Sequence, residues 1–270
     1  MIAGTKVIIH WNKRMAQEKG MAYVMLGRTQ RIEDIFIKGE VDFGGISSSI
    51  LAKLEAKRLD DVFEKQAKQD EDFFILSYLN IRSLNAHKMD VENDDSLMSS
   101  DVIAFGETWL APCEDVDIKG FHGTFASIGR GKGLSTHTKD EEMSSHVLLA
   151  TENGSLIKTT LKKFQVIFAY LSNSCNQIEI CRVLEKCLDV TIPTIIMGDM
   201  NVDAKKDCLL KSFLEERAFS QMIKKPTHEK GFTIDHIYVN ENFNEEDVRI
   251  MQEAVYYSDH DIISIGVKQL

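Results

Sequence analysis

The chain has 270 residues, 43% of them hydrophobic, and a formal net charge of −10 at pH 7. This composition predicts one large globular domain, or a domain with an appendage. Because phosphate contacts depend on Lys and Arg, the acidic balance argues against a protein that adheres to nucleic acid by charge alone.

Membrane and export signals are absent from the sequence. No uncharged apolar run approaches the roughly 20 residues that cross a bilayer, and the first residues lack a signal-peptide layout. We therefore expect an intracellular protein, nuclear or cytoplasmic, that is not secreted and has no membrane partner. The five cysteines include no C-x-x-C pair, and an odd number in an intracellular chain indicates free thiols.

The N-terminal segment contains the stretch "GMAYVMLGRTQRIEDIFIKGEVDF", residues 20–43. It resembles the last motif of superfamily 1 helicases of the Pif1/Helitron type, usually Tyr-Val-x-Leu-Ser-Arg, with Gly27 in the place of the serine. The resemblance implies that residues 1–66 are a truncated C-terminal helicase fragment. It also implies that Arg28 matches the arginine that reaches the γ-phosphate of the nucleotide.

ATP is not an expected partner, because the chain has no G-x-x-x-x-G-K-[ST] phosphate-binding loop. The stretch "GRGKGLST" at 129–136 has the wrong spacing and is expected to form a loop before a strand. Without the phosphate-binding loop, we expect Arg28 to be a surface arginine on a helicase remnant.

Apolar residues near helical spacing predict an amphipathic helix over residues 49–65, behind cap candidates at Ser47–Ser49. Two interpretations stay open for its apolar face, namely packing on the rest of the fold and self-association of the protein. The polar, aperiodic stretch "EKQAKQDED" at 64–72 predicts a linker. We place a domain boundary there, with a second domain over residues 72–270.

Short apolar segments recur after this boundary and are predicted to be strands. They cover residues 73–80, 101–107, 145–151, 163–171, 191–199, 232–240 and 261–268. A helix is predicted over 176–189, where Ile180 and Leu184 share one face behind an Asn176 cap. A second helix is predicted over 206–217. Many strands with a few long helices indicate an α+β fold, or a sheet-on-sheet core with helices outside.

Polar residues stand at the ends of several predicted strands. They are Asn80 in "LN", Glu107 in "GETW", Asp199 and Asn201 in "GDMN", Asp235 in "TIDH", and Asp259 and His260 in "SDHD". Residues two apart on an extended chain point the same way, so Asp199 and Asn201 are expected to converge just past a strand end. Carboxylate and amide oxygens suit magnesium or manganese. A histidine next to an aspartate adds a group that titrates near neutral pH.

The ordered set "LNIRSL", "GETWL", "AYLSNS", "GDMN", "TIDHIYV" and "YSDHD" resembles the endonuclease/exonuclease/phosphatase superfamily. Within it, the set is similar to the endonuclease domains of non-LTR retrotransposons and their apurinic-endonuclease relatives. The resemblance covers residues 72–270 and implies a four-layer αββα sandwich of the DNase I-like kind. The active site would lie at one end of two facing sheets, and the helicase remnant would be an N-terminal appendage.

The resemblance implies a site for Mg²⁺ or Mn²⁺. Asn80 and Glu107 match the positions that hold the metal, and Asp259 matches the acidic position that assists it. Because the chain is acidic, the metal is expected to supply much of the positive charge that a phosphodiester substrate needs.

The resemblance also implies roles for five catalytic residues. Asp199 matches the residue that orients or deprotonates the attacking water. Asn201 matches the amide that contacts the phosphate, and Tyr170 the tyrosine beside it. His260 matches the histidine that faces the scissile phosphate, and Asp235 the residue that orients and charges it. A metal and a protonated histidine would both stabilise the negative charge that grows in the transition state.

Two departures from the family pattern affect the expected substrate contacts. Leu171 follows Tyr170 where the family often has arginine, and Arg82 stands two residues past Asn80, where many relatives have an acid or an amide. With the helicase fragment, the motifs predict a metal-dependent endonuclease of transposon origin that nicks DNA. The alternatives are a phosphatase of the same superfamily and an inactive transposon-derived fragment that at most binds DNA.

Overall fold

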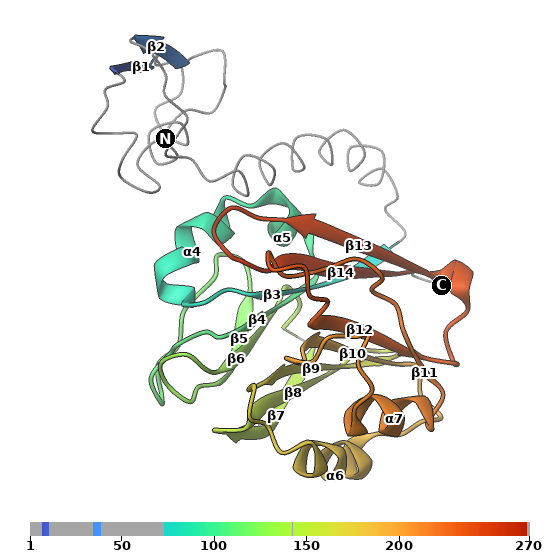
Figure 1. Ribbon diagram of the computed structural model, residues 1–270. Helices are drawn as coiled ribbons and strands as arrows, with labels where there is room; N and C mark the ends of the chain where they lie inside the picture. Colours follow the sequence, from blue (N-terminus) through green and yellow to red (C-terminus); the bar gives the residue numbers. More distant parts are fainter. Residues whose placement is uncertain (1–6, 11–34, 39–72, 142, 269–270) are drawn as a thin grey trace. The chain divides into compact units, whose positions relative to one another are not determined.

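The computed structural model of the protein describes residues 7–10, 35–38, 73–141 and 143–268 (Figure 1). The chain divides into two compact units, Met1–Ala56 and Lys57–Leu270. In the first unit, strands β1 (Val7–His10) and β2 (Ile35–Lys38) pair in parallel. No helix in the described part of the chain is long and apolar enough to cross a membrane.

Two predictions fall outside the described residues. One is the helicase-like motif around Arg28, of whose stretch 20–43 only Ile35–Lys38 is described, and the other is the amphipathic helix over 49–65; both stay predictions. The same holds for the domain boundary placed at 64–72.

The second unit contains two mixed sheets of six strands each among the described residues. In spatial order, the first sheet consists of β13 (Val248–Ala254), β14 (Asp261–Lys268), β3 (Phe73–Asn80), β4 (Val102–Gly106), β6 (Leu134–Thr138) and β5 (His122–Ala126). The second sheet consists of β11 (Phe219–Gln221), β12 (Asp235–Asn240), β10 (Thr194–Asp199), β9 (Gln165–Leu171), β8 (Gly154–Thr160) and β7 (Ser144–Thr151).

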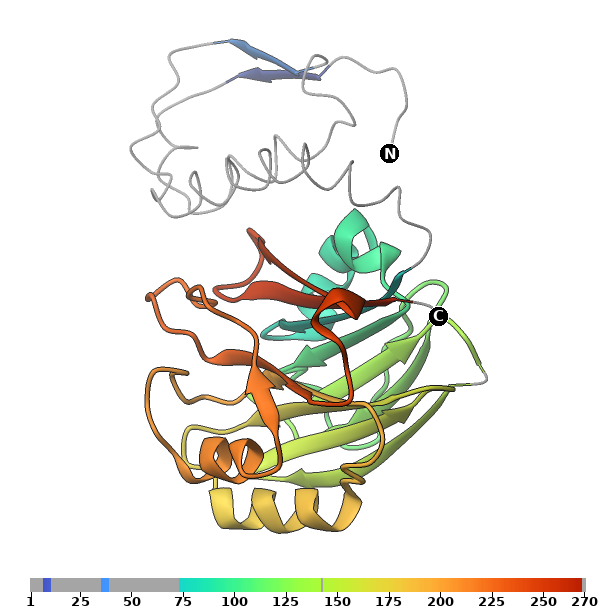
Figure 2. The ribbon, with the colours of Figure 1, turned by 90° about the vertical axis from the view of Figure 1, so that its right-hand side faces the viewer.

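The sheets pack face to face, and helices cover both outer faces (Figure 1 and Figure 2). The helices α4 (Leu84–Glu92) and α5 (Asp95–Ser99) pack on the first sheet. The helices α6 (Gln177–Cys187) and α7 (Leu209–Glu215) pack on the second sheet. This arrangement confirms the predicted four-layer αββα sandwich.

Strand β9 illustrates how side-chain alternation builds these layers, because successive side chains of a strand point to opposite faces. One set enters the core between the sheets and consists of Val166, Phe168 and Tyr170. The other set packs in the layer of α6 and α7 and consists of Ile167, Ala169 and Leu171. A strand buried on both faces is apolar along its whole length, which makes this segment recognisable from the sequence.

All seven predicted strands are present, as β3, β4, β7, β9, β10, β12 and β14, and the helices predicted in this unit are α6 and α7. The structure adds β5, β6, β8, β11, β13, α4 and α5, which have weaker sequence signals. Strand β6 is buried at every position although only Leu134 in its "LSTHT" segment is apolar. A polar strand in a sheet interior has no hydrophobic periodicity by which to recognise it.

Gly198 allows the strand β10 to carry Asp199 into the site. Its φ is +147°, and a Cβ there would lie 1.9 Å from the carbonyl oxygen of Ala169 on β9. Gly231 also has a positive φ of +83°, but a Cβ there would meet nothing within 4 Å. A side chain at Gly198 would meet both a positive φ and a clash with β9, whereas a side chain at Gly231 would meet only the positive φ.

We predict that Gly198→Ala lowers the free energy of unfolding by at least about 3 kcal/mol, because the strand must shift to relieve the clash. The control Gly231→Ala should lose only about 1 kcal/mol from its positive φ. Denaturant unfolding of both variants measures the difference. Equal losses would show that β10 does not need a glycine next to Asp199.

Candidate active site

Strand register places three of the predicted site residues side by side. Asp199, at the end of β10, is the register partner of Tyr170 on β9 and of Asp235 on β12. Asp199 follows Ile195 and Met197 at alternate positions, and these two residues lie in the core between the sheets. The alternation that builds the apolar core therefore points Asp199 into the end of the same space.

Asn80 connects the two sheets at this end of the sandwich. It terminates β3 and is fully buried. Its amide nitrogen Nδ2 donates to Asp199 Oδ2 on the opposite sheet at 2.8 Å and to Glu107 Oε1 at 3.2 Å. One side chain thus holds two carboxylates that come from different sheets.

The backbone turns sharply where β4 delivers Glu107. Gly106 precedes it, and a Cβ on Gly106 would lie 2.0 Å from Tyr78 Oη. Glu107 itself has a φ of +49°, and the indole nitrogen of Trp109 donates to its Oε2 at 3.2 Å. The hydrogen bonds from Trp109 and Asn80 orient the Glu107 carboxylate.

Asn201 holds the Asp199 carboxylate from the loop after β10. Its backbone N–H donates to Asp199 Oδ1 at 2.8 Å, and its Nδ2 lies 3.3 Å from Asp199 Oδ2 and 2.7 Å from the Leu171 carbonyl oxygen. Asn201 has a φ of +51°, a conformation that asparagine tolerates. The expected convergence of Asp199 and Asn201 is present.

Burial and the neighbouring Asp235 carboxylate raise the pKa of Asp199 to about 7. His260 and the hydrogen bonds from Asn201 and Asn80 oppose this rise. The result is a buried carboxyl group that can exchange a proton near neutral pH.

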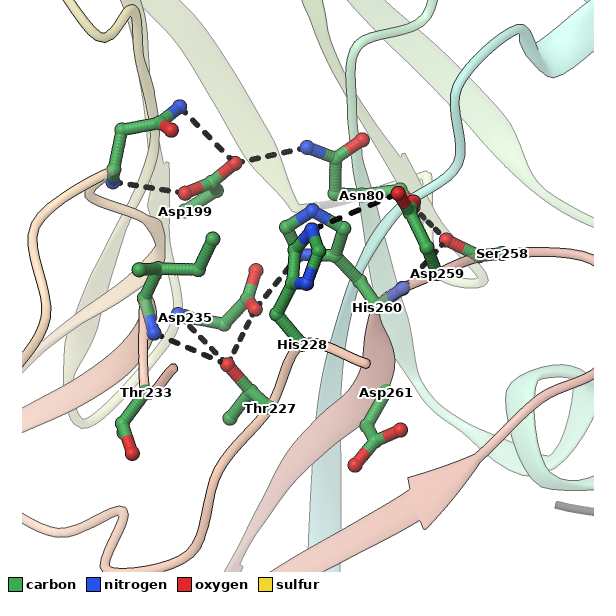
Figure 3. A network of polar contacts seen from close by, with 12 residues as sticks. Asn80, Asp199, Thr227, His228, Thr233, Asp235, Ser258, Asp259, His260 and Asp261 are labelled. Carbon is green, nitrogen blue, oxygen red and sulfur yellow. Dashed lines mark hydrogen bonds and ion pairs between the residues drawn. The ribbon is translucent and has the colours of Figure 1, made fainter. Parts of the chain in front are cut away.

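His260 pairs with Asp235, with 2.8 Å between Nδ1 and Oδ2 (Figure 3). Burial alone would lower the pKa of His260, but Asp235, Asp199 and Asp259 together raise it to about 9. The ring is therefore protonated at neutral pH, with Nδ1 bound to Asp235 and Nε2 left for a ligand. This pairing is the one that the sequence resemblance implies.

Thr227 fixes the position of Asp235. Its hydroxyl donates to Asp235 Oδ2 at 2.6 Å and accepts from the backbone N–H groups of Asp235 at 3.0 Å and Ile234 at 3.2 Å (Figure 3). Thr227 and Asp235 are both fully buried. The hydroxyl thus satisfies three groups that would otherwise be desolvated without a partner.

Asp259 points toward a different set of groups. Its Oδ2 lies 2.7 Å from Arg82 Nη1 and 3.6 Å from His228 Nε2. The neighbouring Ser258 hydroxyl donates to the Asn80 carbonyl oxygen at 2.6 Å and accepts from the His260 N–H at 3.1 Å. Ser258 therefore anchors the loop that carries both Asp259 and His260.

Tyr170 is buried, and its hydroxyl donates to the carbonyl oxygen of Gly131 at 3.1 Å. Burial, followed by the nearby carboxylates of Glu107 and Asp199, raises its pKa. The phenol is therefore neutral and is held by the loop that precedes β6. This loop contains the "GRGKG" stretch, which forms a loop before a strand as expected.

Hydrogen bonds join six of the predicted residues in two groups, whereas Asp259 pairs with Arg82. Asn80, Glu107, Asp199 and Asn201 form one group, and Asp235 and His260 form the other. Sequence reasoning missed Thr227, Ser258 and His228. Thr227 and His228 precede the "TIDH" motif in a loop without periodicity, and serine is common on surfaces, so no local signal marks them.

The residues present fit a hard divalent cation at Asn80 and Glu107. Asn80 Oδ1 is buried and has no hydrogen-bond partner among the described residues. Such an oxygen beside a carboxylate suits Mg²⁺ or Mn²⁺. Two further groups bring ligand atoms within 4.8 Å of one another, and both contain His260. One consists of Asp199, Asp235 and His260, and the other of His228, Asp259 and His260. We favour Asn80 and Glu107, because a protonated His260 cannot bind a metal.

No family model matches the chain, and no curated protein matches it in sequence. Solved structures do match the fold. An AP endonuclease from Archaeoglobus fulgidus is similar with a TM-score of 0.59 and 17% identity, over 73% of this chain and 100% of that chain. The endonuclease domain of TRAS1, a telomere-specific non-LTR retrotransposon, is similar with a TM-score of 0.56 and 13% identity, over 73% and 100%.

A third similar structure is a variant of the 3′ phosphatase NExo from Neisseria bound to a product DNA hairpin, with a TM-score of 0.57 and 15% identity, over 72% of this chain and 99% of that chain. These likenesses show that the chain has the DNase I-like fold of endonuclease/exonuclease/phosphatase proteins.

Thr227 provides a test of how the site is held together. Thr227→Val should lower the free energy of unfolding by about 2 to 3 kcal/mol, because the Asp235 carboxylate and two N–H groups lose a partner in the interior. Thr227→Ser keeps the hydroxyl and should lose less than half of that. Denaturant unfolding compares the two variants. Equal losses would mean that the methyl group, and not the hydroxyl, matters.

Proposed function

We propose that this chain is a divalent-metal-dependent phosphodiesterase that nicks DNA, and that it derives from a transposon. The observation that carries the proposal is the buried Asp235–His260 pair at 2.8 Å, set beside the carboxylate of Asp199. It places a positively charged donor next to a group that can accept a proton. Hydrolysis of a phosphodiester requires both.

His260 binds a non-bridging oxygen of the scissile phosphate through Nε2. Asp235 occupies Nδ1 and stabilises the protonated ring, so Nε2 carries a hydrogen to donate. The charge of the ring opposes the negative charge that develops on the phosphate oxygens during attack.

Asp199 orients the attacking water and accepts its proton. Its Oδ1 is held by the Asn201 N–H and its Oδ2 by Asn80 Nδ2, so the carboxylate keeps one orientation. A pKa near 7 matches a group that takes up a proton at neutral pH. Asn201 and Tyr170 are positioned beside it for contact with the phosphate.

Asn80 and Glu107 would hold a divalent ion, and such an ion would supply Lewis-acid charge to the phosphate. The Trp109 hydrogen bond to Glu107 and the hydrogen bond between Asn80 and Asp199 keep both ligands in place. This contribution is needed because the chain as a whole is acidic.

Basic and aromatic groups near these residues support DNA as the substrate. Arg130 lies 5.9 Å from the centre of the Trp109 ring, and Trp109 contacts Glu107. An exposed arginine near an aromatic ring is suited to the phosphates and bases of a nucleic acid. The similar Neisseria structure is itself bound to a DNA hairpin.

Nicking of a supercoiled plasmid in Mg²⁺ tests the proposal. Asp199→Asn and His260→Gln should each reduce the rate by about 10²- to 10⁴-fold, because each removes a proton acceptor or a charged donor. The exposed His146→Gln is the control and should match the wild type. EDTA should abolish nicking.

A separate assay distinguishes a phosphatase from an endonuclease. A phosphatase of this fold would release inorganic phosphate from a 3′-phosphorylated oligonucleotide and leave the plasmid intact. A folded wild-type protein that does not nick the plasmid in either Mg²⁺ or Mn²⁺ would contradict the endonuclease proposal.

A further inference from the structure

Arg82 lies next to the site and has no role in the proposed chemistry. It follows Asn80 by two residues, and its side chain is 50% exposed. Its Nη1 donates to Asp259 Oδ2 at 2.7 Å. Because a guanidinium has five N–H groups, one bond to a carboxylate leaves several donors for another anion.

The backbone around Arg82 is strained in a way that directs this side chain. Arg82 has a φ of +49° and Ser83 a φ of +96°, and neither residue is glycine. Such conformations cost about 1 to 3 kcal/mol each and persist only where the surroundings enforce them. Here the Ser83 N–H donates to the Glu107 carbonyl oxygen at 2.9 Å and the Leu84 N–H to that of Thr108 at 3.0 Å.

Asp259 is held independently of Arg82. The Glu229 N–H donates to its carbonyl oxygen at 2.9 Å, and His228 Nε2 lies 3.6 Å from its Oδ2. The side chain of Asp259 is 17% exposed, and its Oδ1 is buried without a hydrogen-bond partner among the described residues. The backbone of Asp259 is therefore fixed independently of Arg82, and its Oδ2 contacts the guanidinium.

Exposure increases from His260 to Arg82. The side chain of His260 is 5% exposed, that of Asp259 17% and that of Arg82 50%. A phosphate that reaches His260 lies deep in the site, whereas a phosphate at Arg82 lies at its rim. A DNA strand whose scissile phosphate contacts His260 can therefore place a neighbouring phosphate at Arg82.

We propose that Arg82 binds a backbone phosphate that flanks the scissile phosphodiester, and that Asp259 is a positioning residue for the guanidinium of Arg82. This inference rests on the proposed function, because it assigns the contact to DNA. It gives the acidic chain a fixed cation beside the site, where a bidentate guanidinium–phosphate contact can form.

DNA binding in EDTA, followed by fluorescence anisotropy with a labelled duplex, tests the inference without turnover. Arg82→Gln should raise Kd about 10-fold and reduce the slope of log K against log salt by about 0.9, the value for one phosphate. Arg82→Lys should keep most of the salt slope, because it keeps the charge. The exposed Arg182→Gln, on the outer helix α6, is the control and should bind as the wild type does.

A double-mutant comparison tests the role of Asp259. The effect of Arg82→Gln on Kd should shrink in an Asp259→Asn background, because the guanidinium is no longer held.

If Arg82→Gln binds DNA with an unchanged Kd and salt slope, the inference is overturned. The proposed function still stands in that case if the wild type nicks the plasmid. Wild-type protein that neither binds nor nicks DNA would overturn both. An effect of Arg82→Gln on Kd that is just as large in the Asp259→Asn background would overturn the positioning role of Asp259.

Discussion

Two carboxylates, Asp199 and Asp235, are buried side by side at the ends of neighbouring strands, and the rest of the site depends on this constraint. A buried carboxylate without a partner costs several kcal/mol, and two of them also repel each other. Asn80 and Asn201 donate to Asp199, while Thr227 and His260 donate to Asp235. Four side chains of the site, those of Asn80, Asn201, Thr227 and His260, are thus placed as partners of these two carboxylates.

The same constraint produces the proposed chemistry. Burial and repulsion raise the pKa of Asp199 to about 7, and the surrounding carboxylates raise that of His260 to about 9. A proton acceptor and a charged donor therefore occur together at neutral pH. Arg82 extends this arrangement to the rim, where an ion pair with Asp259 keeps a guanidinium in a defined position.

The sequence predicts the elements whose physical signal is local. Strands such as β9 and β10 are apolar runs, and the polar residues at strand ends mark the site, so Asp199, Asn80 and Asp235 could be named in advance. Their convergence rests on register across three strands and on the facing of two sheets. The polar groups at strand ends suggested a shared oxygen-rich site, and the family resemblance assigned each residue its place in it.

Other parts of the site have no local signal. Thr227 acts through a hydroxyl that meets Asp235 eight residues away, and its loop has no periodicity. Strand β6 is polar although it is buried. Asp259 was assigned to the metal by resemblance, and only the structure reveals its ion pair with Arg82, because the two residues are 177 positions apart in the sequence.

The pairing of Asp235 with His260 is the central claim, and single-turnover cleavage of a labelled DNA duplex by Asp235→Asn tests it most directly. Asparagine keeps the shape of the side chain but removes the charge that keeps His260 protonated. We predict a loss of at least about 100-fold in the cleavage rate with the fold intact. A folded Asp235→Asn protein that cleaves at the wild-type rate would contradict this claim.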